Sequence, residues 1–193
     1  LQLLEQTLSG DCDAVVCCLD AALQYTIPPD ELKKRTVSLK AGQAVSMEQV
    51  LNALNRCGYE RADQVDGTGQ YSQRGGILDI FTPDAPNPAR VEFWGDEIDT
   101  ISLFDLETQR RTETVPQITI APAVEALIDD PGLLAQKIKK LASSLRGKAA
   151  PAAKAVLAGQ AQKLENGLHI GCADKYISLL YSSTATLFDY MVP

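Results

Sequence analysis

The sequence predicts an α+β protein in which a helix packs against a small antiparallel sheet and a mostly helical segment follows. Three observations predict it: an amphipathic helical pattern that begins at Ser46, short runs of alternating polar and apolar residues between 70 and 104, and helical spacing of apolar residues after 122. With 193 residues, 45% of them hydrophobic and 22% charged, the chain has a globular composition and room for one large or two small domains. Helix and sheet together are expected to occupy residues 38–121.

The segment before this unit predicts a β-α-β fragment without a sheet of its own. Residues 1–8 have the pattern of the end of a helix, and residues 14–19 (AVVCCL) form an apolar run typical of a buried strand in a parallel sheet. Two short helices and a short strand are expected next, at residues 20–25, 29–34 and 36–39.

Ser46 begins the clearest helix of the chain. Ser46 and Gln49 match the S-x-x-Q capping box, in which each side chain can satisfy the other residue's free backbone N–H. Apolar residues recur at helical spacing on one face: Met47, Val50, Leu51 and Leu54. Gly58 is suited to end this helix, because glycine readily takes the left-handed conformation found there.

Strands are expected at 71–74, 77–81, 90–94 and 97–104, the last two joined by Gly95-Asp96. Gly followed by Asp suits a two-residue type II′ turn, since glycine tolerates a positive φ at the first central position. The turn predicts a register in which Trp94 faces Glu97, Phe93 faces Ile98, Val91 faces Thr100 and Arg90 faces Ile101.

Because side chains alternate along a strand, this hairpin has two faces. The face assigned to the core carries Val91, Phe93 and Ile98. The other carries Arg90, Glu92, Trp94, Glu97 and Asp99. Trp and Arg are enriched at binding hot spots, so Arg90 and Trp94 on an acidic face predict a binding surface. The alternative is that Arg90 pairs with Glu92 or Asp99 and Trp94 lies over its stem, since isolated apolar residues are common on surfaces.

After a last strand at 118–121, helices are expected at 124–127, 133–145 and 149–164, with Pro131-Gly132 as an interruption. Short amphipathic helices or turns are expected at 174–181 and 184–190. The net charge of −7 is unevenly spread. Residues 62–121 hold four Arg, no Lys and eleven acids, whereas residues 131–163 hold seven Lys or Arg and no acid. The basic region 137–163 could therefore contact DNA, although a solvated helix face is the preferred explanation, and a duplex titration at low salt would decide.

Catalytic and metal-binding motifs are not found in the sequence. The five cysteines have no C-x-x-C spacing, which favours a reducing cytoplasm over disulfides or a zinc site. No G-x-x-x-x-G-K-[ST] loop is present, and His169 is the only histidine. We therefore expect no catalytic residues, no metal ligands and no enzymatic activity. No apolar run approaches the about 18 residues that span a bilayer, and the missing Met suggests a piece of a longer protein.

Two stretches carry a resemblance to a known family: QYSQRGGILDIF at 70–81 and ARVEFWGDEIDTISLFDLETQR at 89–110. They closely resemble the N-terminal module of the bacterial transcription-repair coupling factor (Mfd) family, which is itself similar to the excision-repair protein UvrB. The segments CDAVVCCLDAALQYTIPPDEL and DKYISLLYSSTATLFDYMVP fit the same family, so the resemblance covers nearly the whole chain.

The resemblance implies an architecture in which a small α+β domain is inserted in a helicase-like α/β domain. Residues 1–37 would be the end of the first α/β part (like UvrB domain 1a), 38–121 the inserted domain (like domain 2), and 122–193 a mostly helical return segment (like domain 1b). A full family member adds an RNA-polymerase-binding domain and a translocase motor that uses ATP and Mg. This chain contains neither, so no cofactor is expected in it.

The resemblance also implies a function in transcription-coupled nucleotide excision repair. Family members displace RNA polymerase stalled at DNA damage and recruit UvrA, which the inserted domain binds, while other domains contact polymerase and duplex DNA. The family's UvrA contact residues match Arg74, Arg90 and Trp94. The third position is more often Phe, so Trp94 is a departure that keeps an aromatic face but adds bulk and an N–H donor.

A fragment of UvrB itself is the nearest alternative. UvrB chains tend to carry a Thr-Gly pair where this chain has Thr108-Gln109-Arg110. The DNA-clamping β-hairpin of UvrB should precede the inserted domain, and residues 1–37 show no aromatic-rich hairpin. Both differences favour the coupling-factor family.

Overall fold

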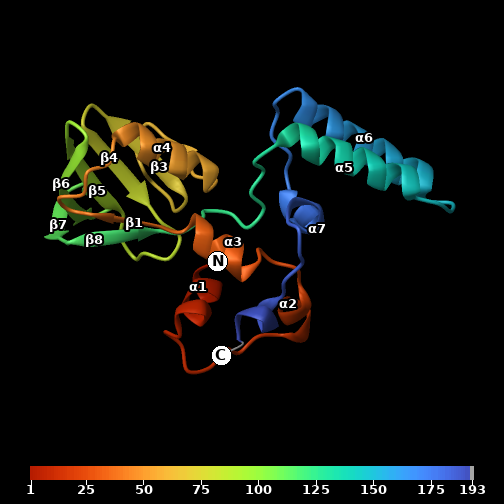
Figure 1. Ribbon diagram of the computed structural model, residues 1–193, viewed down its shortest axis with the longest axis horizontal. Coiled ribbons are helices and arrows are strands. Elements are labelled where there is room, and N and C mark those ends of the chain that lie inside the picture. Colours follow the sequence, from red (N-terminus) through yellow and green to blue (C-terminus); the bar gives the residue numbers. More distant parts are fainter. Residues whose placement is uncertain (192–193) are drawn as a thin grey trace.

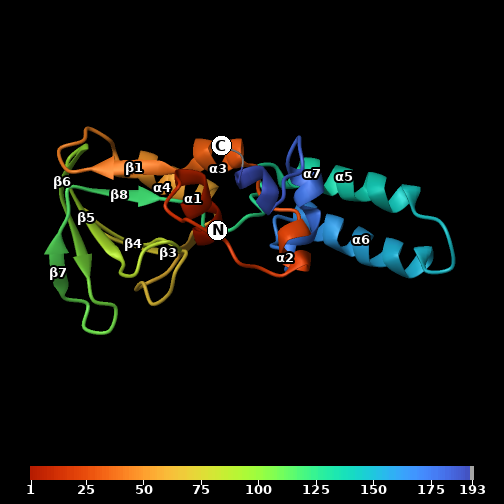
Figure 2. The ribbon, with the colours of Figure 1, turned by 90° about the horizontal axis from the view of Figure 1, so that it is seen from below.

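The computed structural model describes residues 1–191, which form three parts. A sheet domain lies at one end, a helical hairpin at the other, and a lobe of short helices lies between and below them (Figure 1). The perpendicular view also places the sheet domain and the hairpin at opposite ends (Figure 2). The mixed helices and antiparallel strands confirm the α+β class.

The lobe is built from segments near both ends of the described chain. It contains α1 (Gln2–Ser9), α2 (Leu19–Leu23), α3 (Pro29–Arg35) and the 3₁₀ turn η2 (Leu187–Tyr190), so the helices expected near 1–8, 20–25 and 29–34 are confirmed. Its core is apolar apart from one tyrosine hydroxyl and consists of Leu4, Ala22, Ile27, Leu32, Leu127, Leu187 and Tyr190.

The strand expected at 14–19 is wrong. Residues 14–18 form no strand, and Val16 is 97% exposed. A buried strand needs a neighbouring strand to bind its backbone N–H and C=O groups, and the apolar run has none among residues 1–191. The expected β-α-β arrangement is also wrong, because β1 (Val37–Lys40) pairs antiparallel with β8 (Gln117–Ile120) in a two-stranded ribbon.

Helix α4 (Met47–Arg56) begins with the predicted capping box. The Gln49 backbone N–H donates to Ser46 Oγ at 3.3 Å, and the Ser46 N–H donates to Gln49 Oε1 at 3.0 Å. Val50 and Leu54 are buried on its inner face. Just past the helix, Gly58 has φ +79°, and a Cβ there would lie 2.6 Å from Val124 Cγ2, so a larger residue would need both a rare backbone conformation and a shift of the Val124 side chain.

The main sheet has six strands in the order β2-β3-β4-β5-β6-β7, all antiparallel except the β2–β3 pair. Their bounds are β2 Glu60–Arg61, β3 Gln70–Arg74, β4 Ile77–Phe81, β5 Ala89–Trp94, β6 Glu97–Phe104 and β7 Arg111–Thr114. Helix α4 and the β1–β8 ribbon cover its inner face, where the largest core cluster lies. Strand β7 was not expected, because its sequence RTET is polar throughout and all four residues are exposed.

The predicted register of the β5–β6 hairpin is confirmed next to its turn and is wrong further from it. Gly95 has φ +62° while Asp96 does not have a positive φ, as a type II′ turn requires, and Phe93 faces Ile98 as predicted. A β-bulge at Asp99 then shifts the pairing: Val91 faces Ile101 and Arg90 faces Ser102. The bulge has a clear cause. Ile98 and Ile101 are both fully buried, and two residues three apart share a face of a strand only if one extra residue is inserted.

The helical hairpin at the other end of the molecule consists of α5 (Pro131–Ser144) and α6 (Ala150–Glu165). Pro131 does not interrupt α5 but begins it, after Asp130 caps the helix by accepting from the Leu133 N–H at 2.9 Å. Both helices pack against η1 (Ala173–Tyr176) and α7 (Ile177–Leu180), which confirms short helices near 174–181. The helix expected at 124–127 is wrong, because that backbone is instead bound by the Tyr181 hydroxyl, which donates to Glu125 O and accepts from the Leu127 N–H.

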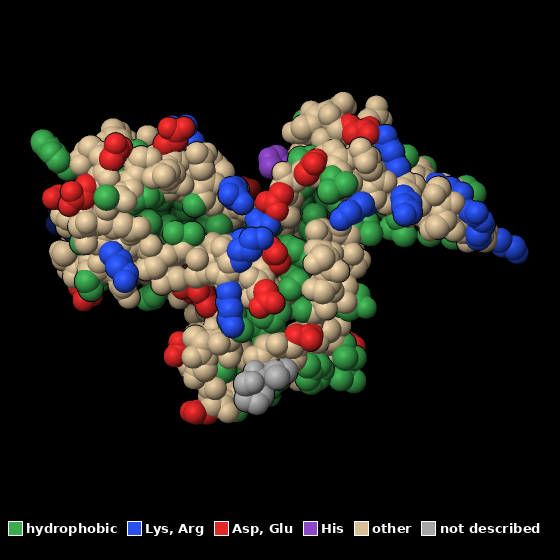
Figure 3. Space-filling model, in the orientation of Figure 1, with side chains coloured by type: hydrophobic (Ala, Val, Ile, Leu, Met, Phe, Trp, Pro, Cys, Tyr) green, Lys and Arg blue, Asp and Glu red, His purple; other side chains and the backbone are tan. Residues whose placement is uncertain are grey.

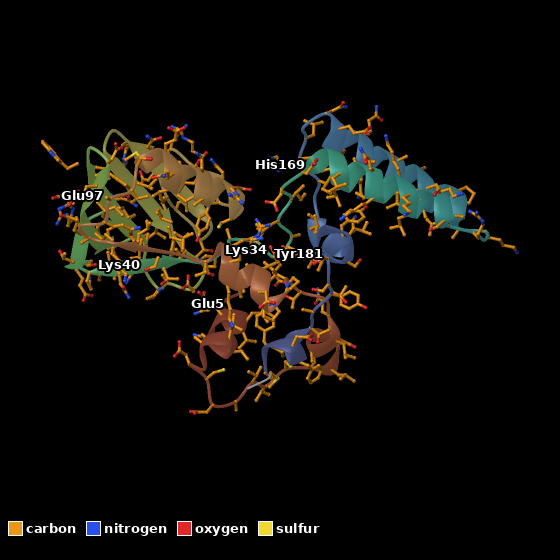
Figure 4. The ribbon with its side chains drawn as sticks, viewed as in Figure 1. Glu5, Lys34, Lys40, Glu97, His169 and Tyr181 are labelled. Carbon is orange, nitrogen blue, oxygen red and sulfur yellow. The ribbon has the colours of Figure 1, made fainter. Side chains whose placement is uncertain are left out.

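Arg35 joins all three parts at their junction, where Figure 4 also places Lys34 and Tyr181. Its side chain is 11% exposed and donates through both Nη atoms to the Asp129 carboxylate, and to Arg56 O at 3.4 Å. The hydrogen bonds from Arg35 hold the pKa of Asp129 below its ordinary value of 3.8 and raise the pKa of Arg35. The pair thus ties α3 and the end of α4 to the segment that leads into α5.

Asp129→Asn is expected to reduce the free energy of unfolding by about 1 kcal/mol or less at pH 7, because the Asp129 side chain is 54% exposed. A carboxylate whose pKa is lower in the folded state stabilises the fold above its ordinary pKa, and this contribution is lost as pH falls through the lowered folded pKa. The difference between the two proteins should therefore shrink below pH 3.8. Urea unfolding at several pH values measures it, and a difference that does not change with pH would contradict the assignment.

Candidate protein-binding face of the sheet

The outer face of the sheet carries a row of polar side chains in register across four strands. Ser72 on β3 faces Asp79 on β4, Asp79 faces Arg90 on β5, and Arg90 faces Ser102 on β6. Ser72, Asp79 and Ser102 are each no more than 2% exposed. Beside the row, a small apolar cluster covers part of the same face and consists of Val65, Phe81, Phe104 and the partly buried Leu106.

Asp79 is the centre of this row. Its carboxylate accepts from Arg90 Nε at 2.7 Å, from Arg90 Nη2 at 2.9 Å and from Arg74 Nη2 at 2.6 Å. The Arg90 guanidinium also lies over the Phe104 ring, 4.7 Å from its centroid. The hydrogen bonds to Asp79 raise the pKa of Arg90. One carboxylate between two guanidinium groups leaves the cluster with one net positive charge.

Arg74 and Trp94 lie at the same end of the sheet. Each is the last residue of its strand, and β3 and β5 run in the same direction because both are antiparallel to β4. The Arg74 side chain is 50% exposed and Trp94 is 84% exposed. This end points away from the hairpin: Figure 4 shows Glu97, next to the Gly95-Asp96 turn, on the far side of the sheet domain from His169.

The structure therefore brings Arg74 and Arg90 together through Asp79 and places Trp94 on the same face, at the end of the sheet where β3 and β5 end. The assignment of Val91, Phe93 and Ile98 to the core face is confirmed. The alternative pairing for Arg90 is wrong, because its carboxylate partner is Asp79, and Trp94 is too exposed to lie over its stem. Arg90 is also less accessible than expected, with its side chain only 14% exposed.

Three residues of this face were missed in the sequence. Asp79 gave a signal, since a single acid inside the apolar strand ILDIF must be paired if it is buried. Arg111 pairs with Glu92 across β6, and no spacing rule predicts a partner on a strand that was not expected. Gln109 takes a left-handed conformation at φ +58°, and its carbonyl lies 3.5 Å from Arg90 Nη1.

On the face shown in Figure 3, the basic side chains of the helical hairpin lie at several separate places along its length. Lys137 donates to Leu179 O, Lys139 pairs with Glu165, and Arg146 donates to the carbonyls of Ser143 and Leu145. Three of the seven cations thus already donate hydrogen bonds within the chain, and one of them, Lys139, is neutralised by a carboxylate.

Other candidate sites carry no recognisable chemistry. A cleft of about 1510 Å³ between the sheet domain and the base of the hairpin has side chains of both charges and His169 along its walls. Within residues 1–191, no group of three or more His, Cys, Asp or Glu side chains is arranged to hold a metal ion. Within the same range, no helix is long and apolar enough to cross a membrane.

Comparison with known proteins agrees with the position of the sheet. Residues 37–125, which contain every strand from β1 to β8, match the family model of the UvrB interaction domain. The chain is similar to the transcription-repair-coupling factors of Bacillus subtilis (33% identity over 98% of this chain), Mycobacterium tuberculosis (33% over 81%) and Haemophilus influenzae (28% over 90%). It covers 17%, 13% and 15% of those proteins, so it spans roughly a sixth of their length.

Proposed function

Because the chain is a homologue of part of the transcription-repair-coupling factors, with a UvrB interaction domain at residues 37–125, we propose a function in recruiting UvrA. We propose that the outer face of its sheet binds UvrA. In this proposal the chain is a non-catalytic recruiting module for nucleotide excision repair at stalled RNA polymerase. Arg74, Arg90 and Trp94 provide the contact.

The single observation that carries the proposal is the exposure of a charged and an aromatic side chain at the same end of the six-stranded sheet. Arg74 keeps half of its surface free although it is bonded to Asp79, and Trp94 has almost all of its surface free. When a partner covers a large exposed aromatic ring, apolar surface is removed from water, and this burial favours binding. Trp beside Arg is the composition of a hot spot for protein binding, and the cluster's net positive charge suits an acidic partner.

The wider architecture is part of the same proposal. We take residues 1–37 as the end of a first α/β part, 38–121 as the inserted domain and 122–193 as the start of the return segment. The longer protein is proposed to act in the cytoplasm as an ATP-driven translocase that contacts RNA polymerase and duplex DNA through other domains. The alternative of a UvrB fragment is not favoured, since the similar proteins named above are all coupling factors.

Arg74→Ala is the variant that tests the proposal with least risk to the fold. Arg74 is half-exposed, and after its removal Asp79 still accepts two hydrogen bonds from Arg90. We expect the wild-type chain to bind purified UvrA and Arg74→Ala to weaken binding by about 2 kcal/mol, or roughly 30-fold. Isothermal titration calorimetry at physiological salt measures both affinities.

Arg61→Ala is the matched control, because Arg61 is an exposed arginine on the edge strand β2 of the same domain. It should leave the affinity for UvrA unchanged. Failure of the wild-type chain to bind UvrA, or equal losses in the two variants, would refute the proposed docking face.

A further inference from the structure

We propose that Asp79 is a positioning residue of the binding face: its buried carboxylate holds Arg74 and Arg90 side by side so that both present free N–H groups to carboxylates of a protein partner. This inference rests on the proposed function, because it assigns how the same face is prepared for its partner. It goes further in naming a residue that does not touch the partner and the kind of group that the partner must supply.

The count of donors leaves unused N–H groups on both arginines after Asp79 is satisfied. A guanidinium has five N–H groups in a fixed plane. Arg90 uses Nε and one N–H of Nη2 on Asp79, which leaves the Nη1–Nη2 edge, with only a long contact of 3.5 Å from Nη1 to Gln109 O. Arg74 uses Nη2 alone. These edges suit bidentate binding of carboxylates.

Without Asp79 the two arginines would not stay together. Their like charges repel, and Arg74 is a long, half-exposed side chain with many rotamers. Asp79 is 1% exposed in a central strand, so its carboxylate is a fixed point to which both side chains are bound. An arginine that is ordered before binding loses less conformational entropy when the partner arrives.

The other polar residues of the row do not take over this role. The Ser72 hydroxyl, opposite Asp79, donates to Asp63 O at 2.8 Å instead. A buried ion pair is often no better for stability than well-packed apolar residues, so stability alone does not explain a carboxylate here. What the carboxylate provides, and an apolar residue would not, is a pair of oriented guanidinium groups, that of Arg74 half-exposed and that of Arg90 mostly buried beside it.

The first test needs no variant and no UvrA. In the free wild-type chain, ¹⁵N relaxation of arginine Nε should show Arg74 ordered, in contrast to Arg61, an exposed arginine for which no ion pair is found among the described residues. If Arg74 is as mobile as Arg61, the positioning role of Asp79 is overturned, whether or not the chain binds UvrA. If Arg74 is ordered but the wild-type chain does not bind UvrA, the proposed function fails and this side-chain arrangement stands.

The second test is a double-mutant cycle on UvrA affinity. Asp79→Asn, whose fold is checked by circular dichroism and urea unfolding, should weaken UvrA binding about tenfold in the wild-type background and less than about threefold in the Arg74→Ala background. Ser72→Ala is the control, since it changes a neighbouring buried polar residue whose hydroxyl donates to Asp63 O rather than pairing with Arg74 or Arg90, and it should leave the affinity unchanged. An unchanged affinity in Asp79→Asn, or the same loss in both backgrounds, overturns the proposal.

Discussion

Arg90→Ala is expected to lower the free energy of unfolding by about 3 kcal/mol, although Arg90 was singled out in the sequence as a binding residue. Asp79 is almost completely buried and would lose two of its three charge-assisted hydrogen bonds. Removing one partner of a buried ion pair typically costs 3–5 kcal/mol, and the remaining bond from Arg74 places this variant near the lower end, at about 3 kcal/mol. The lost contact with the Phe104 ring adds to the cost.

Urea unfolding measures this loss, and Arg111→Ala is its matched control. Arg111 also pairs with a carboxylate of the outer face, but its side chain is 50% exposed and its partner Glu92 is 22% exposed. A surface pair contributes about 1 kcal/mol or less, so the control should lose much less than Arg90→Ala. If Arg90→Ala lost no more than Arg111→Ala, Arg90 would not be part of a buried cluster. Because of this expected loss, reduced UvrA binding by Arg90→Ala would not by itself identify a contact.

Trp94→Ala should have the opposite profile, with a large loss of UvrA affinity and almost no loss of stability. Trp94 is 84% exposed at the end of β5, so its removal leaves no cavity and should change the free energy of unfolding by less than about 0.5 kcal/mol. Covering an indole by a partner buries a large apolar area, and truncation of such an anchor commonly costs about 2–4 kcal/mol, a reduction in affinity of at least 30-fold.

Tyr25→Ala is the control for this effect. Tyr25 is an aromatic residue that is 53% exposed in the short-helix lobe, away from the sheet. It should not change UvrA affinity. A Trp94→Ala chain that binds UvrA as tightly as the wild type would remove the aromatic anchor from the proposed face.

Local signals in the sequence predicted much of the sheet domain correctly. The capping box at Ser46 and the Gly95-Asp96 turn depend on a few neighbouring residues, and both have the predicted geometry. The bulge at Asp99 could not be predicted in the same way, because it follows from the need to bury both Ile98 and Ile101 against α4 and the ribbon. Alternation assigns successive residues to opposite faces of a strand, but it does not show where a bulge is needed to bring a particular residue to the core face.

Longer-range contacts explain the other differences. The apolar run at 14–19 has the composition of a buried strand, but a strand also needs a neighbour, and composition does not say whether one is present. A proline within a helical pattern predicts an interruption, whereas Pro131 begins α5 because it stands at the first helical position, directly after the capping residue Asp130. For the candidate site, the sequence indicated Arg90 and Trp94 on one face. The role of Asp79 as the partner of both arginines follows only from the strand order, which places β4 between β3 and β5.

The binding site of UvrA on this chain can be located directly by hydrogen exchange. Amide hydrogen exchange of the chain, alone and in complex with UvrA, shows which backbone segments the partner covers. If the outer sheet face binds UvrA, we expect new protection at the end of the sheet that carries Arg74 and Trp94, in residues 73–77 and 93–97, and unchanged exchange in α5 and α6. Protection confined to the hairpin or to the short-helix lobe, with residues 73–77 and 93–97 unchanged, would contradict it.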